Sequence, residues 1–105
     1  MVRRGQIWTL LRGGSQYCVL VISNDEYNEV QELAIWALVI ARDVPRPNQL
    51  AVGLRAGDPL SGSFVKIHGV VQILDRDALR ETHGFVSRAT MTAVEDGLRE
   101  FLELP

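Results

Sequence analysis

The chain lacks several features that would assign it to a special class of protein. It has one cysteine among 105 residues, so neither an intramolecular disulfide nor a cysteine-based metal motif is available. Its longest apolar runs, CVLVI and AIWALVIA, are well short of the roughly 18 residues that a membrane-spanning helix needs. The N-terminal stretch MVRRGQIW contains no apolar region of the kind found in a secretory signal. We therefore expect a cytoplasmic protein in which Cys18 is an inert core thiol.

A large excess of charge of one sign is missing as well. The formal net charge is −2, which argues against binding nucleic acid through bulk attraction alone. Residues 1–66 carry seven basic and six acidic side chains, whereas residues 67–105 carry four basic and seven acidic ones. Ten of the eleven cations are arginine, which suits bidentate phosphate contacts, although a GC-rich genome would produce the same bias.

What is present is typical of a small folded protein. Hydrophobic residues make up 47% of the chain and charged residues 23%, a balance that excludes intrinsic disorder. The length leaves room for one core, so we expect a single domain over residues 1–105. Strand-like segments recur at short spacing and end in Gly, Pro, Asn or Asp, which favours a small barrel or sandwich. The predicted strands are Gln6–Leu11, Tyr17–Ile22, Leu33–Ala41, Gln49–Leu54, Ser63–His68 and Val70–Leu74.

After residue 74 the pattern changes from strand to helix. Residues 75–80 predict one short helical turn, and Phe85–Val86 a brief final strand. Ser87 stands at an N-cap position ahead of apolar residues at helical spacing, which predicts an amphipathic C-terminal helix. Earlier in the chain, the Asx side chains of Ser23-Asn24-Asp25 end the second strand and cap the turn that follows. The expected fold class is thus mainly β with a C-terminal α-helix.

The order of several short motifs resembles the MazF/PemK family of toxins. VRRGQIW is followed by a strand ending VISNDEYN, and then by LAVGL, VQILD and GFVS before the closing helix. The resemblance implies a small SH3-like barrel of the CcdB/PemK type, usually a symmetric homodimer, that is the toxin component of a type II toxin–antitoxin pair. Members are metal-independent, sequence-specific endoribonucleases (mRNA interferases) that use no cofactor. Each is held inactive by a cognate antitoxin whose acidic tail lies across the RNA groove.

The sequence departs from the family where catalysis is expected. The family has Arg-Pro at the start of the second strand, and this chain has Tyr17 and Cys18 there. The family's third strand supplies a threonine, and this chain has Ala41. The loop between the first two strands is also shorter than in the family. The resemblance therefore implies a groove for single-stranded RNA in which both usual catalytic side chains are replaced.

Other polar residues could supply the missing chemistry. The catalytic candidates are Tyr17, Arg42 and His68. An arginine can stabilise a phosphorane, a tyrosine can donate a proton or stack on a base, and histidine titrates near neutral pH. The RNA-binding candidates are Arg12, Ser15, Gln16, Arg46 and Lys66. Four of the candidates also have a structural interpretation: Arg42 as a solvated strand end, Tyr17 as a packing residue, and Lys66 and His68 as surface positions. We expect His83 to be a loop residue without a catalytic part, and we expect no metal site.

Two other functions remain open at this point. One is a non-catalytic RNA-, DNA- or antitoxin-binding protein on the same scaffold. The other is a gyrase poison resembling CcdB, whose action depends on a C-terminal tryptophan. This chain ends Phe101-Leu-Glu-Leu-Pro105 without a tryptophan, which makes the gyrase hypothesis the weakest of the three.

Overall fold

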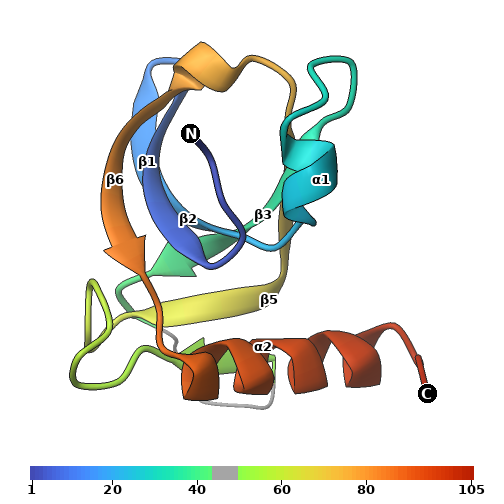
Figure 1. The fold of residues 1–105 in the computed structure, drawn as a ribbon. Coiled ribbons are helices and arrows are strands. Elements are labelled where there is room, and N and C mark those ends of the chain that lie inside the picture. Colours follow the sequence, from blue (N-terminus) through green and yellow to red (C-terminus); the bar gives the residue numbers. More distant parts are fainter. Residues whose placement is uncertain (44–49) are drawn as a thin grey trace.

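The computed structural model describes residues 1–43 and 50–105, and there the chain forms a strongly curved antiparallel sheet and a helix (Figure 1). In sheet order the strands are β4 (Ala51–Gly53), β5 (Phe64–Ile73), β3 (Ile35–Ala41), β2 (Ser15–Val21), β1 (Gln6–Arg12) and β6 (Leu79–Phe85). The remaining elements are helix α1 (Asp25–Asn28), a single 3₁₀ turn η1 (Arg76–Ala78) and helix α2 (Arg88–Phe101). The prediction of a mainly β fold with a C-terminal helix is confirmed.

The first two strands form a tight hairpin that turns within Arg12-Gly-Gly-Ser15. Arg12 pairs with Ser15, so Gly13 and Gly14 are the two turn residues. Both have positive φ, +59° and +78°, a conformation that glycine adopts without the steric cost that other residues incur. The hairpin fixes the register that sets Thr9 opposite Cys18.

Strand β5 is longer than expected. Two strands were predicted on either side of Gly69, but a single strand runs from Phe64 to Ile73. The strand is irregular near Gly69, because the register against β3 shifts between Leu38 and Ile40. A Cβ at Gly69 would lie 3.2 Å from Lys66 Cβ and 3.3 Å from Val39 Cβ, so a side chain would crowd this bend. The bend lets one strand pair with β4 at one end and with β3 along most of its length.

The prediction was wrong for the segment before α2. Residues 79–85 form a full strand, β6, rather than the end of a helical turn and a two-residue strand. The sequence LRETHGF is largely exposed and has no apolar alternation, so it lacks a strand signal of its own. Its pairing with β1 makes it a strand.

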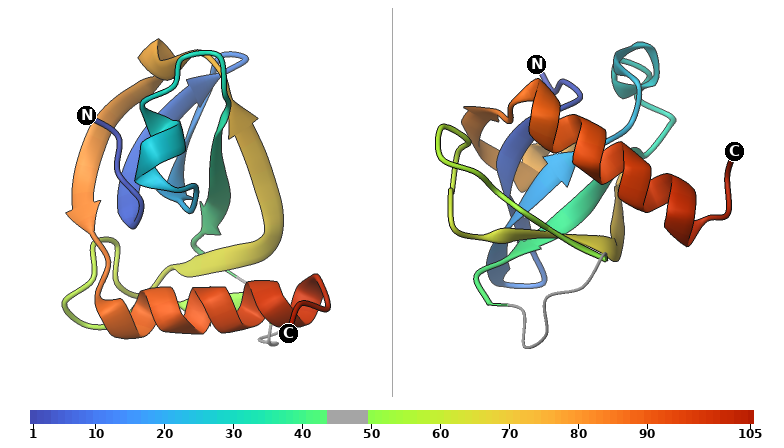
Figure 2. Two further views of the ribbon diagram at one scale, coloured as in Figure 1. Left: turned by 45° about the vertical axis from the view of Figure 1, so that its right-hand side comes forward. Right: turned by 90° about the horizontal axis from the view of Figure 1, so that it is seen from below.

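Helix α2 lies across one end of the curled sheet, against β4 and β5 (Figure 2). Ser87 is its N-cap, as predicted, and its hydroxyl accepts a hydrogen bond from the Thr90 N–H at 3.2 Å. Val94 of the helix is fully buried in a core cluster with residues of the strands, among them Ile7, Leu20 and Ile67. A second cluster, which includes Leu10, Val21 and Ile35, lies apart from the helix. Among the described residues, no helix is both long and apolar enough to cross a membrane.

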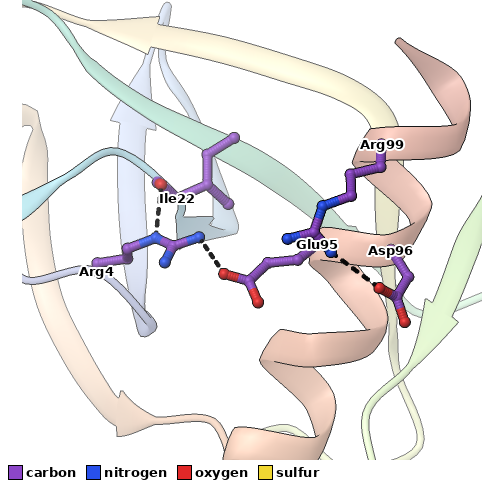
Figure 3. A network of polar contacts seen from close by, with 5 residues as sticks. All are labelled: Arg4, Ile22, Glu95, Asp96 and Arg99. Carbon is purple, nitrogen blue, oxygen red and sulfur yellow. Dashed lines mark hydrogen bonds and ion pairs between the residues drawn. The ribbon is translucent and has the colours of Figure 1, made fainter. Parts of the chain in front are cut away.

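Arg4 joins the N-terminal segment to two other parts of the fold (Figure 3). Its Nε donates to the Ile22 carbonyl at 3.0 Å, and its Nη2 forms an ion pair with Glu95 of α2 at 2.8 Å. The Arg4 N–H also donates to Asp25 Oδ1 at 2.6 Å. These contacts hold the end of β2 and the middle of α2 at fixed positions relative to the first strand.

Candidate functional site

A cavity of about 370 Å³ opens where β2 begins and β3 ends. Its lining residues come from these two strands and from the loop before β5: Gln16, Tyr17, Cys18, Ile40, Arg42, Leu60 and Ser63. The strands are antiparallel, with Val19 opposite Val39, so the start of one lies beside the end of the other. We call this cavity the cleft.

Three candidates predicted from the sequence line the cleft together. They are Gln16, Tyr17 and Arg42. Gln16 and Arg42 are exposed, whereas Tyr17 is half-buried against the second core cluster. Within residues 1–43 and 50–105, the Arg42 guanidinium has no hydrogen-bond or ion-pair partner, and Asp43 beside it makes no ion pair with it. The guanidinium is therefore available for an anionic ligand.

The loop wall of the cleft is held by a buried carboxylate. Asp58, which is 7% exposed, accepts hydrogen bonds from the Arg55 N–H at 2.9 Å, the Ser87 N–H at 2.7 Å and the Thr90 hydroxyl at 2.5 Å. Burial by itself raises the pKa of this carboxyl, but the hydrogen bonds from Thr90, Ser87 and Arg55 outweigh it and hold the pKa below its ordinary value. Asp58 thus ties the loop that carries Leu60 to the first turn of α2.

The structure corrects the assignment of His83. It lies in strand β6 and not in a loop. Its Nε2 is 2.8 Å from the Thr9 hydroxyl oxygen and 4.0 Å from the Cys18 sulfur. Cys18 packs against the core, as expected, but it is half-buried and forms part of the cleft wall. No local signal in the sequence reveals this cluster, because its members lie on three different strands.

The other predicted site residues lie outside the cleft. The Arg12 guanidinium donates to the Gln72 carbonyl at 2.6 Å, and Ser15 is exposed at the first position of β2. Lys66 and His68 lie on the face of β5 opposite the buried residues Val65 and Ile67. Arg46 lies outside the described residues. In the part of the chain that the structure describes, no group of three His, Cys, Asp or Glu side chains is suited to hold a metal ion.

A second cavity, of about 380 Å³, is lined by Trp8, Arg76 and residues near the N-terminus. The cationic side chain in its lining is Arg76, whose guanidinium already donates hydrogen bonds to the carbonyls of Asn28, Val30 and Leu33. None of the predicted site residues lines it. The cleft is therefore the stronger candidate for a functional site.

Comparison with protein families gives a match over nearly the whole chain. Residues 3–102 match the family described as PemK-like, MazF-like toxin of type II toxin–antitoxin systems. The chain belongs to this toxin family. The order of motifs seen in the sequence and the curled sheet with its closing helix agree with the assignment. No curated protein sequence matches the toxin.

Solved structures share the toxin's fold over its full length. An endoribonuclease in complex with its cognate antitoxin, from a mycobacterial species, is 26% identical with a TM-score of 0.89, covering 100% of this chain and 98% of the other. A second endoribonuclease from a mycobacterial species is 26% identical with a TM-score of 0.85, covering 99% and 93%. The MazE–MazF complex of Deinococcus radiodurans is 21% identical with a TM-score of 0.83, covering 99% and 97%, and is evidence for the fold alone.

Proposed function

We propose that this toxin is an endoribonuclease that cuts single-stranded RNA in the cleft between β2 and β3. The proposal rests on one observation, which is that Gln16, Tyr17 and Arg42 line the same cavity of a toxin fold. Two solved structures with this fold, each 26% identical to the toxin, are endoribonucleases from mycobacterial species. The cleft offers a cation, a phenol and an amide, which together can bind phosphate, sugar and base.

Each residue of the cleft has a proposed role. The unpartnered Arg42 guanidinium binds the scissile phosphate and stabilises the charge of the phosphorane. Tyr17 donates a proton to the leaving oxygen or stacks on a base, and Gln16 binds an exposed base edge. Ser15, although next to Gln16 on β2, lies outside the cleft and has no role in the proposed site. His68 and Lys66 are not part of the proposed site, because both lie outside the cleft.

The proposal includes the partners of the toxin. A cognate antitoxin with an acidic tail docks over the cleft, toward which the positive balance of residues 1–66 attracts it. Two copies of the toxin associate through exposed apolar residues, for which Trp36, Val70 and Phe101, at 44%, 39% and 45% exposed, are the candidates. The toxin acts in the cytoplasm, on mRNA. If crosslinks from a cognate antitoxin fell only on residues 88–105, docking over the cleft would be wrong.

Incubation with RNA tests the proposed activity. Purified toxin mixed with a long single-stranded RNA in EDTA should give fragments ending in 2′,3′-cyclic phosphate and beginning with a free 5′-hydroxyl. The antitoxin, added at equal concentration, should stop the reaction. Intact RNA across many sequences would reject the proposal.

A second function is favoured by the residues at the family's catalytic positions. Tyr17 and Ala41 stand where the family has arginine and threonine, so the fold could bind RNA, DNA or antitoxin without cutting. In that case RNA would be retained in a binding assay but would stay intact. Arg42→Gln would then weaken binding and change no cleavage.

A further inference from the structure

His83 occupies an irregular position in the sheet. Trp8 pairs with Thr82 and Ile7 pairs with Gly84, so His83 is the extra residue of a β-bulge in β6. Gly84, which follows it, has a φ of +98°, a conformation that side chains other than glycine rarely adopt. Bulges change the direction in which a side chain points, and they are frequent next to active sites. Here the bulge directs the imidazole across β1 toward β2.

The imidazole meets polar groups on both of these strands. Its Nε2 lies 2.8 Å from Thr9 Oγ1 on β1 and 4.0 Å from Cys18 Sγ on β2. Thr9 Oγ1 and Cys18 Sγ are 3.9 Å apart. The three side chains therefore form a cluster, Thr9–Cys18–His83. Of the three, Cys18 is the one that also lines the cleft.

Thr9 is suited to hold a histidine that changes its protonation state. A hydroxyl can donate to the lone pair of neutral imidazole, and after rotation it can accept from the N–H of imidazolium. The pair keeps its hydrogen bond in both states, which is the arrangement expected of a proton-transfer residue and its orienting partner.

We propose that His83 is the proton acceptor for RNA cleavage in this toxin, an inference that rests on the proposed function. The ribose 2′-hydroxyl attacks the adjacent phosphorus, forming the O2′–P bond, while its proton passes to the Thr9 hydroxyl as the Thr9 proton passes to Nε2 of the neutral imidazole. The P–O5′ bond breaks, and the leaving oxygen takes a proton from the Tyr17 phenol or from water. The products are a 2′,3′-cyclic phosphate and a 5′-hydroxyl, so no metal, oxidant or other reagent is consumed.

Five titratable groups lie on the neighbouring elements. Arg80 and Glu81 are on β6 with His83, and Tyr17, Cys18 and Arg42 line the cleft. Of these, only Cys18 makes a polar contact with the ring among the described residues. Cys18 has a single side-chain torsion before its sulfur, and the proposal requires rotation about this χ1 to open a path from the cleft to the imidazole.

The chain contains two histidines, so one substitution at each position tests the assignment. Single-turnover cleavage by the wild-type toxin should slow as the solution is acidified, because protonation of the imidazole removes the acceptor lone pair. His83→Gln can still form a hydrogen bond with Thr9 but does not titrate. Its cleavage rate should no longer fall at acidic pH, and its kcat should be about 10²-fold lower. In His68→Gln, the cleavage rate should still fall at acidic pH. The inference would be overturned if the dependence of cleavage rate on pH were unchanged in His83→Gln. It would also be overturned if the fall of the rate at acidic pH were lost in His68→Gln instead.

Substitutions at Thr9 test the positioning contact. Thr9→Val removes the hydroxyl at almost constant shape and should lower kcat about tenfold or more while leaving KM unchanged. Thr9→Ser restores a hydroxyl and should rescue most of the rate. Equal loss in both variants, or a loss confined to KM, would mean that the Thr9–His83 contact is only structural.

A binding measurement separates failure of this inference from failure of the proposed function. A 2′-O-methyl RNA oligonucleotide cannot be cut, and its addition should shift the His83 ring resonances in an NMR spectrum while leaving those of His68 in place. Wild-type toxin that cuts RNA without a His83 shift contradicts the inference alone. Wild-type toxin that neither cuts RNA nor shows the shift contradicts both the inference and the proposed endoribonuclease activity.

Discussion

The Thr90 hydroxyl donates a 2.5 Å hydrogen bond to the Asp58 carboxylate, across 32 positions of sequence. Both residues are buried, at 0% and 7% exposed. The bond fixes the loop wall of the cleft to the start of α2, the helix that closes one end of the sheet. The geometry of the cleft therefore depends on a contact between two residues that do not line it.

Removing this hydroxyl should destabilise the toxin. Thr90→Val leaves a buried carboxylate oxygen without one of its donors, which should lower the free energy of unfolding by about 1–3 kcal/mol in urea denaturation. Thr92→Val is the matched control, because Thr92 is an exposed residue of the same helix. Its effect should stay within about 0.5 kcal/mol. Equal effects of the two substitutions would contradict the role assigned to the Thr90–Asp58 bond.

Asp58 should also make the toxin sensitive to acid. Its pKa is lowered in the folded protein, so its stabilising contribution is complete above the ordinary aspartate pKa of about 3.9 and is lost as the pH falls through the lower folded value. The free energy of unfolding, measured between pH 7 and pH 2, should decline below about pH 4. Asp58→Asn should be less stable at pH 7 and show a shallower decline. A parallel pH dependence in wild type and variant would rule out this contribution.

Arg76 should control the order of the segment after α1. Its guanidinium donates to backbone carbonyls of Asn28, Val30 and Leu33 at 3.0 Å or less. Lysine carries the same charge but cannot form this planar set of bonds. Arg76→Lys should accelerate hydrogen–deuterium exchange of residues 28–34, whereas Arg80→Lys on the exposed strand β6 should not. Unchanged exchange in Arg76→Lys would show that the segment is held by other contacts.

Arg42 should bind the RNA phosphate through its charge. Arg42→Gln removes the cation from the cleft and should reduce cleavage about 10²-fold or more, with weaker dependence of RNA binding on salt. Arg55→Gln is a suitable control, because Arg55 is exposed and does not line the cleft. A loss of the same size in both variants would indicate a general effect of charge.

Cys18 should control access to His83. Cys18→Ala widens the path from the cleft to the imidazole and should keep or raise the cleavage rate, whereas Cys18→Val fills that path and should lower it. Both variants remove the thiol, so their difference isolates the steric effect. A similar loss of activity in both would point to a chemical role of the thiol instead.

Much of the architecture follows from local pattern in the sequence. The apolar runs that contain Val19–Val21 and Ile35–Ile40 predict buried strands, because a strand buried on both faces needs apolar side chains at successive positions. Asn24 and Ser87 predict helix or turn caps, since their side-chain oxygens accept nearby backbone N–H groups, as observed. Gly13 and Gly14 predict the first turn for the same kind of local reason. Motif order in the chain also predicts the toxin family that the comparison confirms.

Only the tertiary structure decided which polar residues meet. Strand β6 has no apolar alternation, so its existence and its bulge depend on pairing with β1. The position of His83 depends on the same pairing. Thr9 and Cys18 are 74 and 65 residues away from His83 in sequence, and no local preference encodes contacts at that separation. Such contacts depend on strand register, which the packing of the whole sheet sets.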